Sequence, residues 1–213
     1  MVFYNAHTHF SNQPDYEIFQ GNLEEDCVFF YSAGLHPWQA ERYDDRIEKK
    51  MIQNWSNPKC LAVGEIGLDK LKGPSLDIQQ EIFSKQIEFS EKMELPVILH
   101  CVKAWNELRS IKKKMQPKQQ WVFHGFSKIG ILQEVLTEEI MISIGSTILT
   151  HPKKEELING IPFHRLLLET DDSAIDLKEI YKTVAELKKI SLQQLAELIE
   201  QNFQNTFTKW HIG

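Results

Sequence analysis

The sequence predicts an α/β fold, a (β/α)8 barrel of the TIM type, and three observations lead to it. Short apolar runs alternate with longer amphipathic stretches, as strands and helices do around a parallel sheet. Run after run ends in a histidine or a carboxylate, and a parallel barrel gathers such residues at one face. The chain has 213 residues, near the lower limit for this fold. No linker, repeat or low-complexity tract divides it, so we expect one domain over residues 1–213.

Seven apolar runs are typical of strands buried on both faces, because they are short, continuous and rich in β-branched or aromatic residues. They are residues 2–4, 28–31, 61–63, 97–99, 121–123, 141–144 and 166–168. An eighth strand is expected at residues 16–19, which completes the number that the barrel needs.

Helical patterns fill the later intervals between these runs. Apolar residues recur at helical spacing over residues 78–93, 108–115 and 192–203, and Ser191 with Gln194 matches a capping box. Residues 10–15 and 21–26 are too few for parallel crossovers, which usually take about a dozen residues or more. We therefore expect a shortened, distorted barrel whose N-terminal helices are reduced or missing. An open doubly wound sheet is the competing architecture.

The composition excludes several classes of protein. With 42% hydrophobic residues the chain is too apolar to be disordered, and the net charge of -6 disfavours a protein that coats nucleic acid, though not an enzyme that acts on it. No apolar run approaches the ~18 residues that cross a bilayer, and the first residues lack the features of a secretory signal. Three widely spaced cysteines, Cys27, Cys60 and Cys101, indicate a reducing compartment, so we expect a cytoplasmic protein.

Polar residues follow the predicted strands where each strand ends. They are His7, His9, His36, Glu65, His100, His124, Glu169 and Asp171. Residues two apart on a strand point the same way, so His7 can share a target with His9. Imidazole and carboxylate together suit zinc, manganese or iron, and four histidines with two carboxylates are enough for two metal ions.

Each of these residues also has a simpler interpretation. Glu65 and Asp171 are possible helix caps, and His100 or His124 alone is typical of a hydrogen-bonded interior histidine. The joint pattern favours a metal site, because burying so many ionisable groups at one end of a barrel is costly unless they are paired or coordinated.

The motifs resemble those of the TatD family of metal-dependent hydrolases, within the amidohydrolase-like TIM-barrel superfamily. The resemblance covers nearly the whole chain. Its motifs are His7-Thr8-His9, Gly34-Leu35-His36-Pro37, Gly64-Glu65-Ile66-Gly67-Leu68-Asp69, Leu95 to His100, His124 to Ser127, and Leu166 to Asp171. The motifs around Glu65 and Asp171 are specific, whereas a His-x-His pair alone is not.

The resemblance implies a barrel with two divalent metal ions and a deoxyribonuclease or related phosphoesterase activity. By that implication His7, His9 and Asp171 hold one metal ion, His100 and His124 hold the second, and Glu65 bridges them. His36 then lies near the substrate. We expect the two ions to be zinc, magnesium or manganese.

Three positions depart from the usual family pattern. Asn5 stands where an aspartate usually precedes the His-x-His pair, and Val102 stands where an arginine usually follows the fourth motif. After Asp171 the chain leads quickly into a helix instead of a long loop. These departures affect the expected substrate and leave the expected metal ligands in place.

We interpret the chain as a metal-dependent hydrolase of ester bonds, with Asp171 accepting a proton from the attacking water and Glu65 as its catalytic partner. Glu169 orients a ligand if it shares the face of Asp171, and Trp38 and Lys103 are candidate contacts to a base and a phosphate. DNA or a nucleotide is the expected substrate of a monomer that needs no membrane or obligate partner. Hydrolysis of small amides, esters or lactones is the second hypothesis, and a metal-binding barrel without catalysis is the third.

Overall fold

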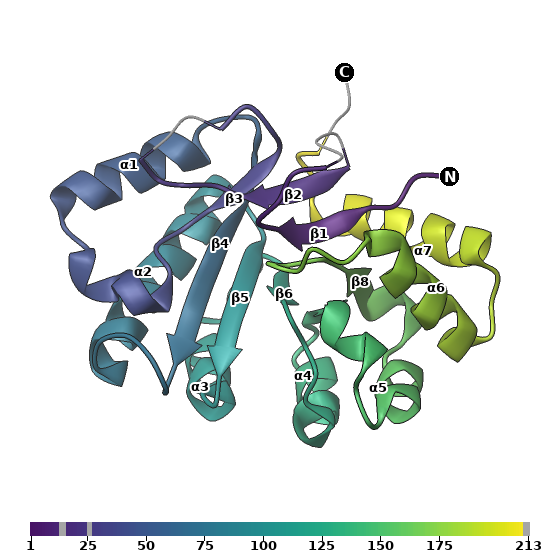
Figure 1. Ribbon diagram of the computed structural model, residues 1–213. Helices are drawn as coiled ribbons and strands as arrows, with labels where there is room; N and C mark the ends of the chain where they lie inside the picture. The colour runs from purple at the N-terminus through teal and green to yellow at the C-terminus, as the bar shows by residue number, and fades with distance from the viewer. Residues whose placement is uncertain (13–15, 25–26, 211–213) are drawn as a thin grey trace. The chain divides into compact units, whose positions relative to one another are not determined.

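Strands alternate with helices along the chain in the computed structural model, which describes residues 1–12, 16–24 and 27–210 (Figure 1). The strands in this described part are β1 (Asn5–Thr8), β2 (Glu17–Gln20), β3 (Tyr31–Ala33), β4 (Cys60–Asp69), β5 (Val97–Val102), β6 (Trp121–Phe123), β7 (Met141–Ile144) and β8 (Leu166–Leu168). The helices are α1 (Asp45–Trp55), α2 (Leu76–Met93), α3 (Trp105–Met115), α4 (Leu132–Thr137), α5 (Lys154–Gly160), α6 (Leu177–Lys188) and α7 (Leu192–Thr206). Short 3-10 helices are η1 (Pro37–Arg42), η2 (Ile129–Ile131), η3 (Ser146–Leu149) and η4 (Phe163–Arg165).

The described residues form two compact units. The first contains Met1–Phe19 and Val122–Thr208, and the second contains Gln20–Trp121. The expectation of one domain over residues 1–213 stays a prediction.

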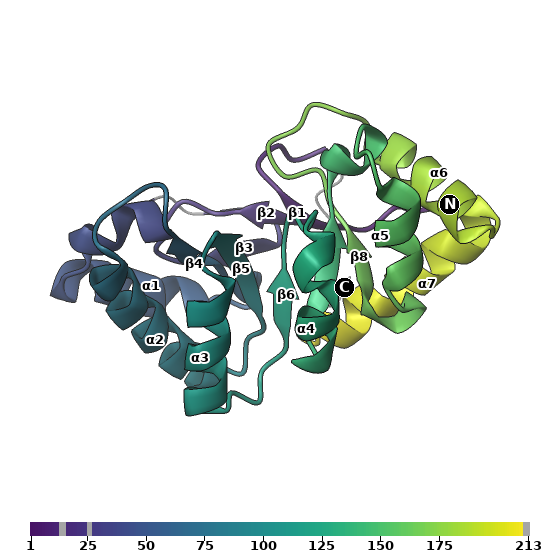
Figure 2. The ribbon, with the colours of Figure 1, turned by 90° about the horizontal axis from the view of Figure 1, so that it is seen from below.

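In the second unit, β3, β4 and β5 pair in parallel, with Ala33 opposite Val63 and Gly67 opposite His100. All ten residues of β4 are buried, because helices cover this sheet: α1 and α2 pack against β4, and α3 packs against β5. Figures 1 and 2 show these three helices side by side. The periodic residues of α2 supply the core, with Ile82, Phe83 and Ile87 all buried.

In the first unit, β6, β7 and β8 pair in parallel, and so do β1 and β2. An isolated parallel bridge joins Thr8, at the end of β1, to Asp171, just beyond β8. Helices α6 and α7 lie side by side and both contact β8 (Figure 1). The predicted capping box is present, since the Ser191 side chain accepts from Gln194 N and the Gln194 side chain accepts from Ser191 N.

Parallel strands that alternate with helices confirm the predicted (β/α)8 class. Neighbouring strands within each unit are consecutive in the sequence, whereas a doubly wound sheet reverses its strand order at a switch point. In the described residues no helix lies between β1 and β2 or between β2 and β3, so the expected loss of the N-terminal helices is confirmed. No described helix has the length and the apolar character that a membrane span requires.

Two predicted strands are misplaced. The structure begins β1 at Asn5 and not at Val2, and it places β3 at Tyr31–Ala33 and not at residues 28–31. An apolar run locates a strand only if the buried side chains of that strand are apolar, and this does not hold for β1. Most of β1 is polar yet buried, because its side chains meet partners from the turn after β8.

Candidate metal centre

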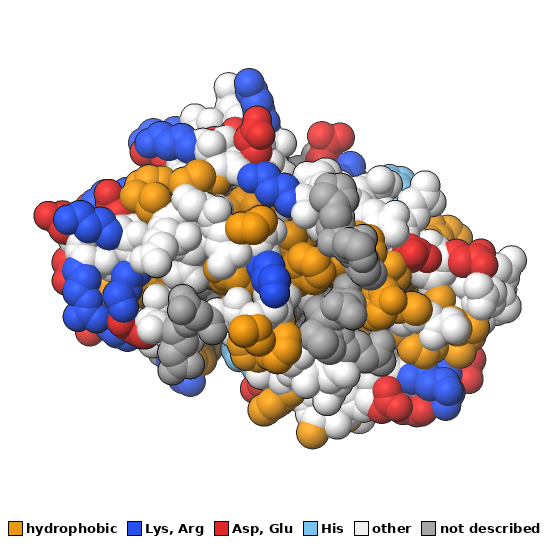
Figure 3. Space-filling view, turned by 90° about the horizontal axis from the view of Figure 1, so that it is seen from above, with side chains coloured by type: hydrophobic (Ala, Val, Ile, Leu, Met, Phe, Trp, Pro, Cys, Tyr) orange, Lys and Arg blue, Asp and Glu red, His pale blue; other side chains and the backbone are white. Residues whose placement is uncertain are grey.

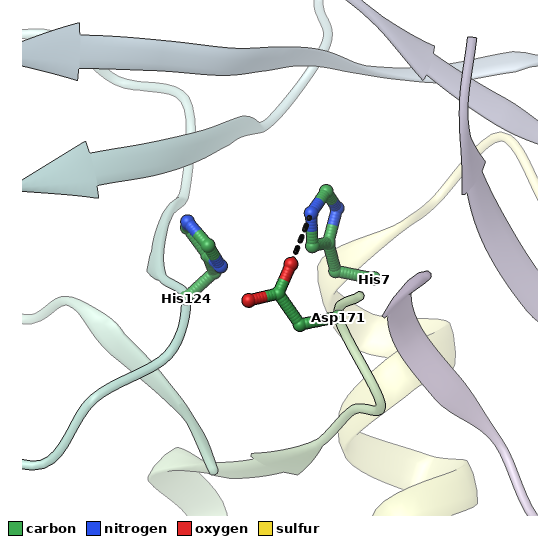
Figure 4. A group of neighbouring side chains, drawn as sticks. All are labelled: His7, His124 and Asp171. Atoms are coloured by element: carbon green, nitrogen blue, oxygen red, sulfur yellow. Dashed lines mark ion pairs between the residues drawn. The ribbon is translucent and has the colours of Figure 1, made fainter. Parts of the chain in front are cut away.

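Four predicted ligands meet in the first unit, and we name His7, His9, His124 and Asp171 the first cluster. The Nε2 atoms of His7 and His9 each lie 3.5 Å from Asp171 Oδ1, and the rings of His7 and His124 are 4.8 Å apart between centroids. One ligand atom from each of His7, His124 and Asp171 lies within 4.8 Å of the others. Figure 4 shows the Asp171 carboxylate between the two imidazole rings.

The backbone explains how His9 and Asp171 come together. His9 N donates to Asp171 O at 2.9 Å, and Asp171 N donates to His7 O at 3.1 Å, so the chain after β8 runs beside the end of β1. Asp171 has a φ of 55°, a left-handed conformation that aspartate tolerates better than most residues. Asp171 therefore does not cap α6. Asp176 has that role, with its side chain accepting from Lys178 N.

A chain of hydrogen bonds behind the first cluster fixes the same two segments. Asn5 Oδ1 accepts from Thr170 N at 3.0 Å, and Asn5 Nδ2 donates to Thr170 Oγ1 at 2.9 Å. Thr170 Oγ1 in turn donates to Thr8 Oγ1 at 2.9 Å, and Thr8 Oγ1 donates to Phe10 O at 3.0 Å. Asn5, where the family usually has aspartate, therefore uses both its acceptor and its donor, and a carboxylate has no N–H to give.

Glu169 lies beside His124 and is fully buried. Its Oε1 accepts from Gly125 N at 2.6 Å and lies 3.5 Å from His124 Nδ1. A carboxylate at this position can hold the imidazole ring in one orientation. In the structure Glu169 therefore contacts His124, whereas the sequence predicted that Glu169 shares the face of Asp171.

The second unit carries a second cluster, which we define as His36, Glu65, Asp69 and His100. His100 Nδ1 lies 2.7 Å from Glu65 Oε1, and His100 Nε2 lies 3.2 Å from Asp69 Oδ2. His36 Nε2 is 3.5 Å from Glu65 Oε1. Glu65 is an interior residue of β4 and caps no helix.

Asp69 was not among the predicted site residues. Burial acts to raise its pKa, but hydrogen bonds from Trp38, from the Leu71 backbone and from His100 outweigh burial and lower it. Trp38 Nε1 donates to Asp69 Oδ2 at 2.6 Å, so one carboxylate holds both an indole and an imidazole. Strand periodicity could have identified it, because Asp69 is four residues from Glu65 and shares its face of β4.

Of the predicted substrate contacts, His36 belongs to the second cluster and Trp38 adjoins it. The Trp38 ring packs edge-on against His36 at 4.5 Å between centroids, and Lys72 Nζ lies 4.0 Å from its ring centroid. Lys103 is exposed directly after β5, and Val102 is the last residue of that strand. Part of the Trp38 ring surface therefore already contacts other residues of the chain.

The donor chemistry of both clusters fits divalent metal ions. Each presents imidazole nitrogens and carboxylate oxygens within a few ångströms of each other, and these are the ligands of zinc and manganese sites. The expected sharing of one metal ion by His100 and His124, and the bridging role of Glu65, stay predictions.

Comparisons with known proteins agree with the motifs. The model of the TatD related DNase family matches residues 15–208. The metal-dependent hydrolase YjjV of Escherichia coli is 29% identical over 89% of this chain and 80% of its own. The 3'-5' ssDNA/RNA exonuclease TatD of Erwinia tasmaniensis is 34% identical over 66% of this chain and 56% of its own.

Solved structures show the same fold. The crystal structure of YjjV from E. coli superposes with a TM-score of 0.83 and 23% sequence identity, covering 97% of this chain and 98% of that one. With a family model matched over most of its length, this chain belongs to the TatD related DNase family.

Proposed function

We propose that the protein is a divalent-metal-dependent phosphodiesterase that hydrolyses DNA or nucleotides. Membership of the TatD related DNase family confirms the predicted class, a metal-dependent hydrolase of ester bonds. The observation that supports the proposal most is the first cluster, where His7, His9, His124 and Asp171 converge from three separate strand ends. The Erwinia relative is named as an exonuclease of single-stranded DNA and RNA, and its action on DNA supports the same substrate for this chain.

We propose two divalent ions, with zinc, magnesium and manganese as the candidates. His7, His9, His124 and Asp171 are the proposed ligands in the first unit, and Glu65 and His100 are those in the second. Divalent cations lower the pKa of a bound water and neutralise charge on a phosphate.

The chain's own groups then have distinct tasks. Asp171 Oδ2 accepts the proton that the attacking water loses, while Asp171 Oδ1 faces both His7 and His9. Glu65 acts beside His100, and Glu169 keeps the His124 ring oriented. His36, Trp38 and Lys103 are the proposed contacts to the substrate.

We further propose a monomer in the cytoplasm that meets nucleic acid only transiently and needs no obligate protein partner or membrane. The described part of the chain contains free cysteines, which suits a reducing compartment such as the cytoplasm.

Cleavage of end-labelled DNA tests the proposal. Metal-free protein is supplied with Mg2+, Mn2+ or Zn2+, and release of nucleotides from single- and double-stranded DNA is measured. We expect metal-restored cleavage that Asp171→Asn reduces at least a hundredfold, since proton transfer contributes about 10²–10⁴ to the rate. The matched control is Asp172→Asn, the exposed neighbouring carboxylate. Metal-bound protein that cleaves no DNA but hydrolyses small esters, amides or lactones contradicts the nuclease proposal.

A further inference from the structure

A cavity of about 450 Å3 lies within the first unit, between the segments around β1 and the turn that follows β8. Its apolar wall includes Phe3, Phe10 and Ile175. Phe10 is 55% exposed and Ile175 is 39% exposed, so these side chains leave apolar surface facing the opening. The volume is within the range of about 300–1,000 Å3 that is typical of small-molecule sites.

Two residues that line the cavity are sequence neighbours of proposed metal ligands, although the ligands themselves do not line it. Phe10 directly follows His9, and Thr170 directly precedes Asp171. The hydrogen bonds that run from Asn5 through Thr170 and Thr8 to the Phe10 carbonyl connect the cavity wall to the backbone of both ligand segments. A substrate held at the first cluster can therefore place a neighbouring group in this cavity.

The polar lining of the cavity is acidic. Glu17, on β2, is only 2% exposed, and its Oε1 accepts from Asn12 N at 2.9 Å. Asp176 is the second carboxylate, and among the described lining residues there is no lysine, arginine or histidine. No described cation pairs with Glu17, although a buried carboxylate is costly when it lacks donors. Such a lining repels a phosphate and favours a ligand that brings N–H donors.

We propose that this cavity binds a nucleobase of the substrate, with guanine as the preferred base. A carboxylate has about four lone-pair positions, so Glu17 retains acceptor capacity after its bond with Asn12 N. Guanine presents two adjacent N–H donors, at N1 and N2, to such a group, whereas thymine presents one at N3. The Phe10 ring supplies the apolar face on which a base stacks. This inference rests on the proposed action on nucleic acid and adds its base preference.

Binding of nucleosides tests the inference without metal, phosphate or turnover. Dissociation constants of deoxyguanosine and thymidine are measured by NMR titration on the metal-free full chain. We expect deoxyguanosine to bind about tenfold more tightly, which is typical of one good pair of donor contacts. Glu17→Gln, which keeps side-chain size, should reduce the preference to less than threefold, while Glu179→Gln on the exposed face of α6 should leave it intact.

Phe10→Ala tests the stacking face separately. The loss of one aromatic platform should weaken both nucleosides by about fivefold or more, whereas Phe163→Ala, which removes another exposed ring, should change neither. Unfolding temperatures within about 2 °C of the unmodified protein show that each variant still folds. Equal affinities for the two nucleosides, or a preference that survives Glu17→Gln, overturn the inference.

The same variants separate this inference from the proposed function. On metal-loaded protein, oligonucleotides ending in dG should be cleaved faster than those ending in dT, and Glu17→Gln should abolish the difference. Cleavage without any effect of Glu17→Gln overturns the base site and leaves the nuclease intact. Nucleoside binding with the expected preference, combined with no cleavage under any metal, retains the base site and overturns the nuclease.

Discussion

At the residue scale, one nitrogen atom distinguishes Asn5 from the aspartate that the family usually has. The Asn5 amide both accepts a hydrogen bond from Thr170 and donates one to it. Asn5 is buried, with 4% of its surface exposed to solvent. Because Thr170 Oγ1 accepts from Asn5, its own hydroxyl hydrogen is available for the hydrogen bond to Thr8 Oγ1. An aspartate would leave Thr170 Oγ1 without this donor and would add a buried negative charge.

Asn5→Asp should lower the free energy of unfolding by about 1–3 kcal/mol, the usual result of removing one partner from a buried hydrogen-bonded pair. Urea unfolding monitored by circular dichroism measures the change. The control is Asn22→Asp, because Asn22 is exposed and its Oδ1 accepts from Glu24 N, a bond that aspartate keeps. Equal stability of the two variants would contradict the assigned donor role of Asn5 Nδ2.

Asp69 gives a second prediction at this scale, since it contacts a proposed ligand and the indole of Trp38. Asp69→Asn should weaken metal binding at the second cluster by about 10–100-fold, as changes behind metal ligands generally do. Competition with a chromogenic chelator measures the affinity, and Asp77→Asn, an exposed carboxylate at the start of α2, is the control. An unchanged affinity would show that Asp69 does not position His100.

At the element scale, tyrosines attach the start of β1 to α6 and α7. Tyr181, on α6, donates its hydroxyl to Tyr4 O at 2.8 Å and accepts from Tyr4 N at 3.0 Å. Tyr4 donates its own hydroxyl to Glu200 Oε1, on α7, at 2.8 Å. Burial and the neighbouring Glu200 carboxylate raise the pKa of Tyr4 to about 12, and burial raises the pKa of Tyr181 well above its usual value.

This arrangement predicts a loss of stability at alkaline pH. Both folded pKa values lie above the unfolded value of about 10, so above pH 10 the unfolded chain releases protons that the folded protein keeps. Stability therefore falls as pH rises from about 10 to 12. Each tyrosine that releases its proton on unfolding lowers the free energy of unfolding by up to about 1.4 kcal/mol per pH unit. Tyr4→Phe should remove the contribution of one tyrosine and so make the fall less steep. Urea unfolding between pH 9 and pH 11.5 measures both slopes, and identical slopes would contradict the Tyr4 assignment.

The elements also show what sequence patterns could and could not predict. Hydrophobic periodicity located α2 and α7, because each helix buries apolar residues at helical spacing among its buried polar ones. It misplaced β1, whose buried residues are Asn5, Ala6, His7 and Thr8. These polar residues are buried because partners from the turn after β8 satisfy them, and no local pattern shows a partner more than 160 residues away. The ligand candidates were predictable because each comes within a few residues after an apolar run of the sequence. The link between Glu169 and His124 depends on tertiary structure.

At the scale of the whole molecule, the net charge of -6 means that nucleic acid is not attracted by the chain's overall charge. On the face shown in Figure 3, lysine and arginine side chains stand among acidic and hydrophobic ones and form no continuous basic surface. Bound divalent cations would add positive charge where the carboxylates of the two clusters gather. Phosphate recognition by this chain should therefore depend on metal more than on surface lysines.

Metal binding should also stabilise the molecule as a whole. A ligand that binds only the folded state at a hundred times its dissociation constant adds about 2.7 kcal/mol, which raises the unfolding temperature of a chain this size by about 5–11 °C. Calorimetry of metal-free protein, with each of Mg2+, Mn2+ and Zn2+ added in turn, measures the shift. His7→Ala should reduce it, because His7 is a buried member of the first cluster, whereas His164→Ala at an exposed position should not. If none of the three ions raises the unfolding temperature, the two clusters are hydrogen-bonded polar networks and the metal-dependent mechanism is wrong for this chain.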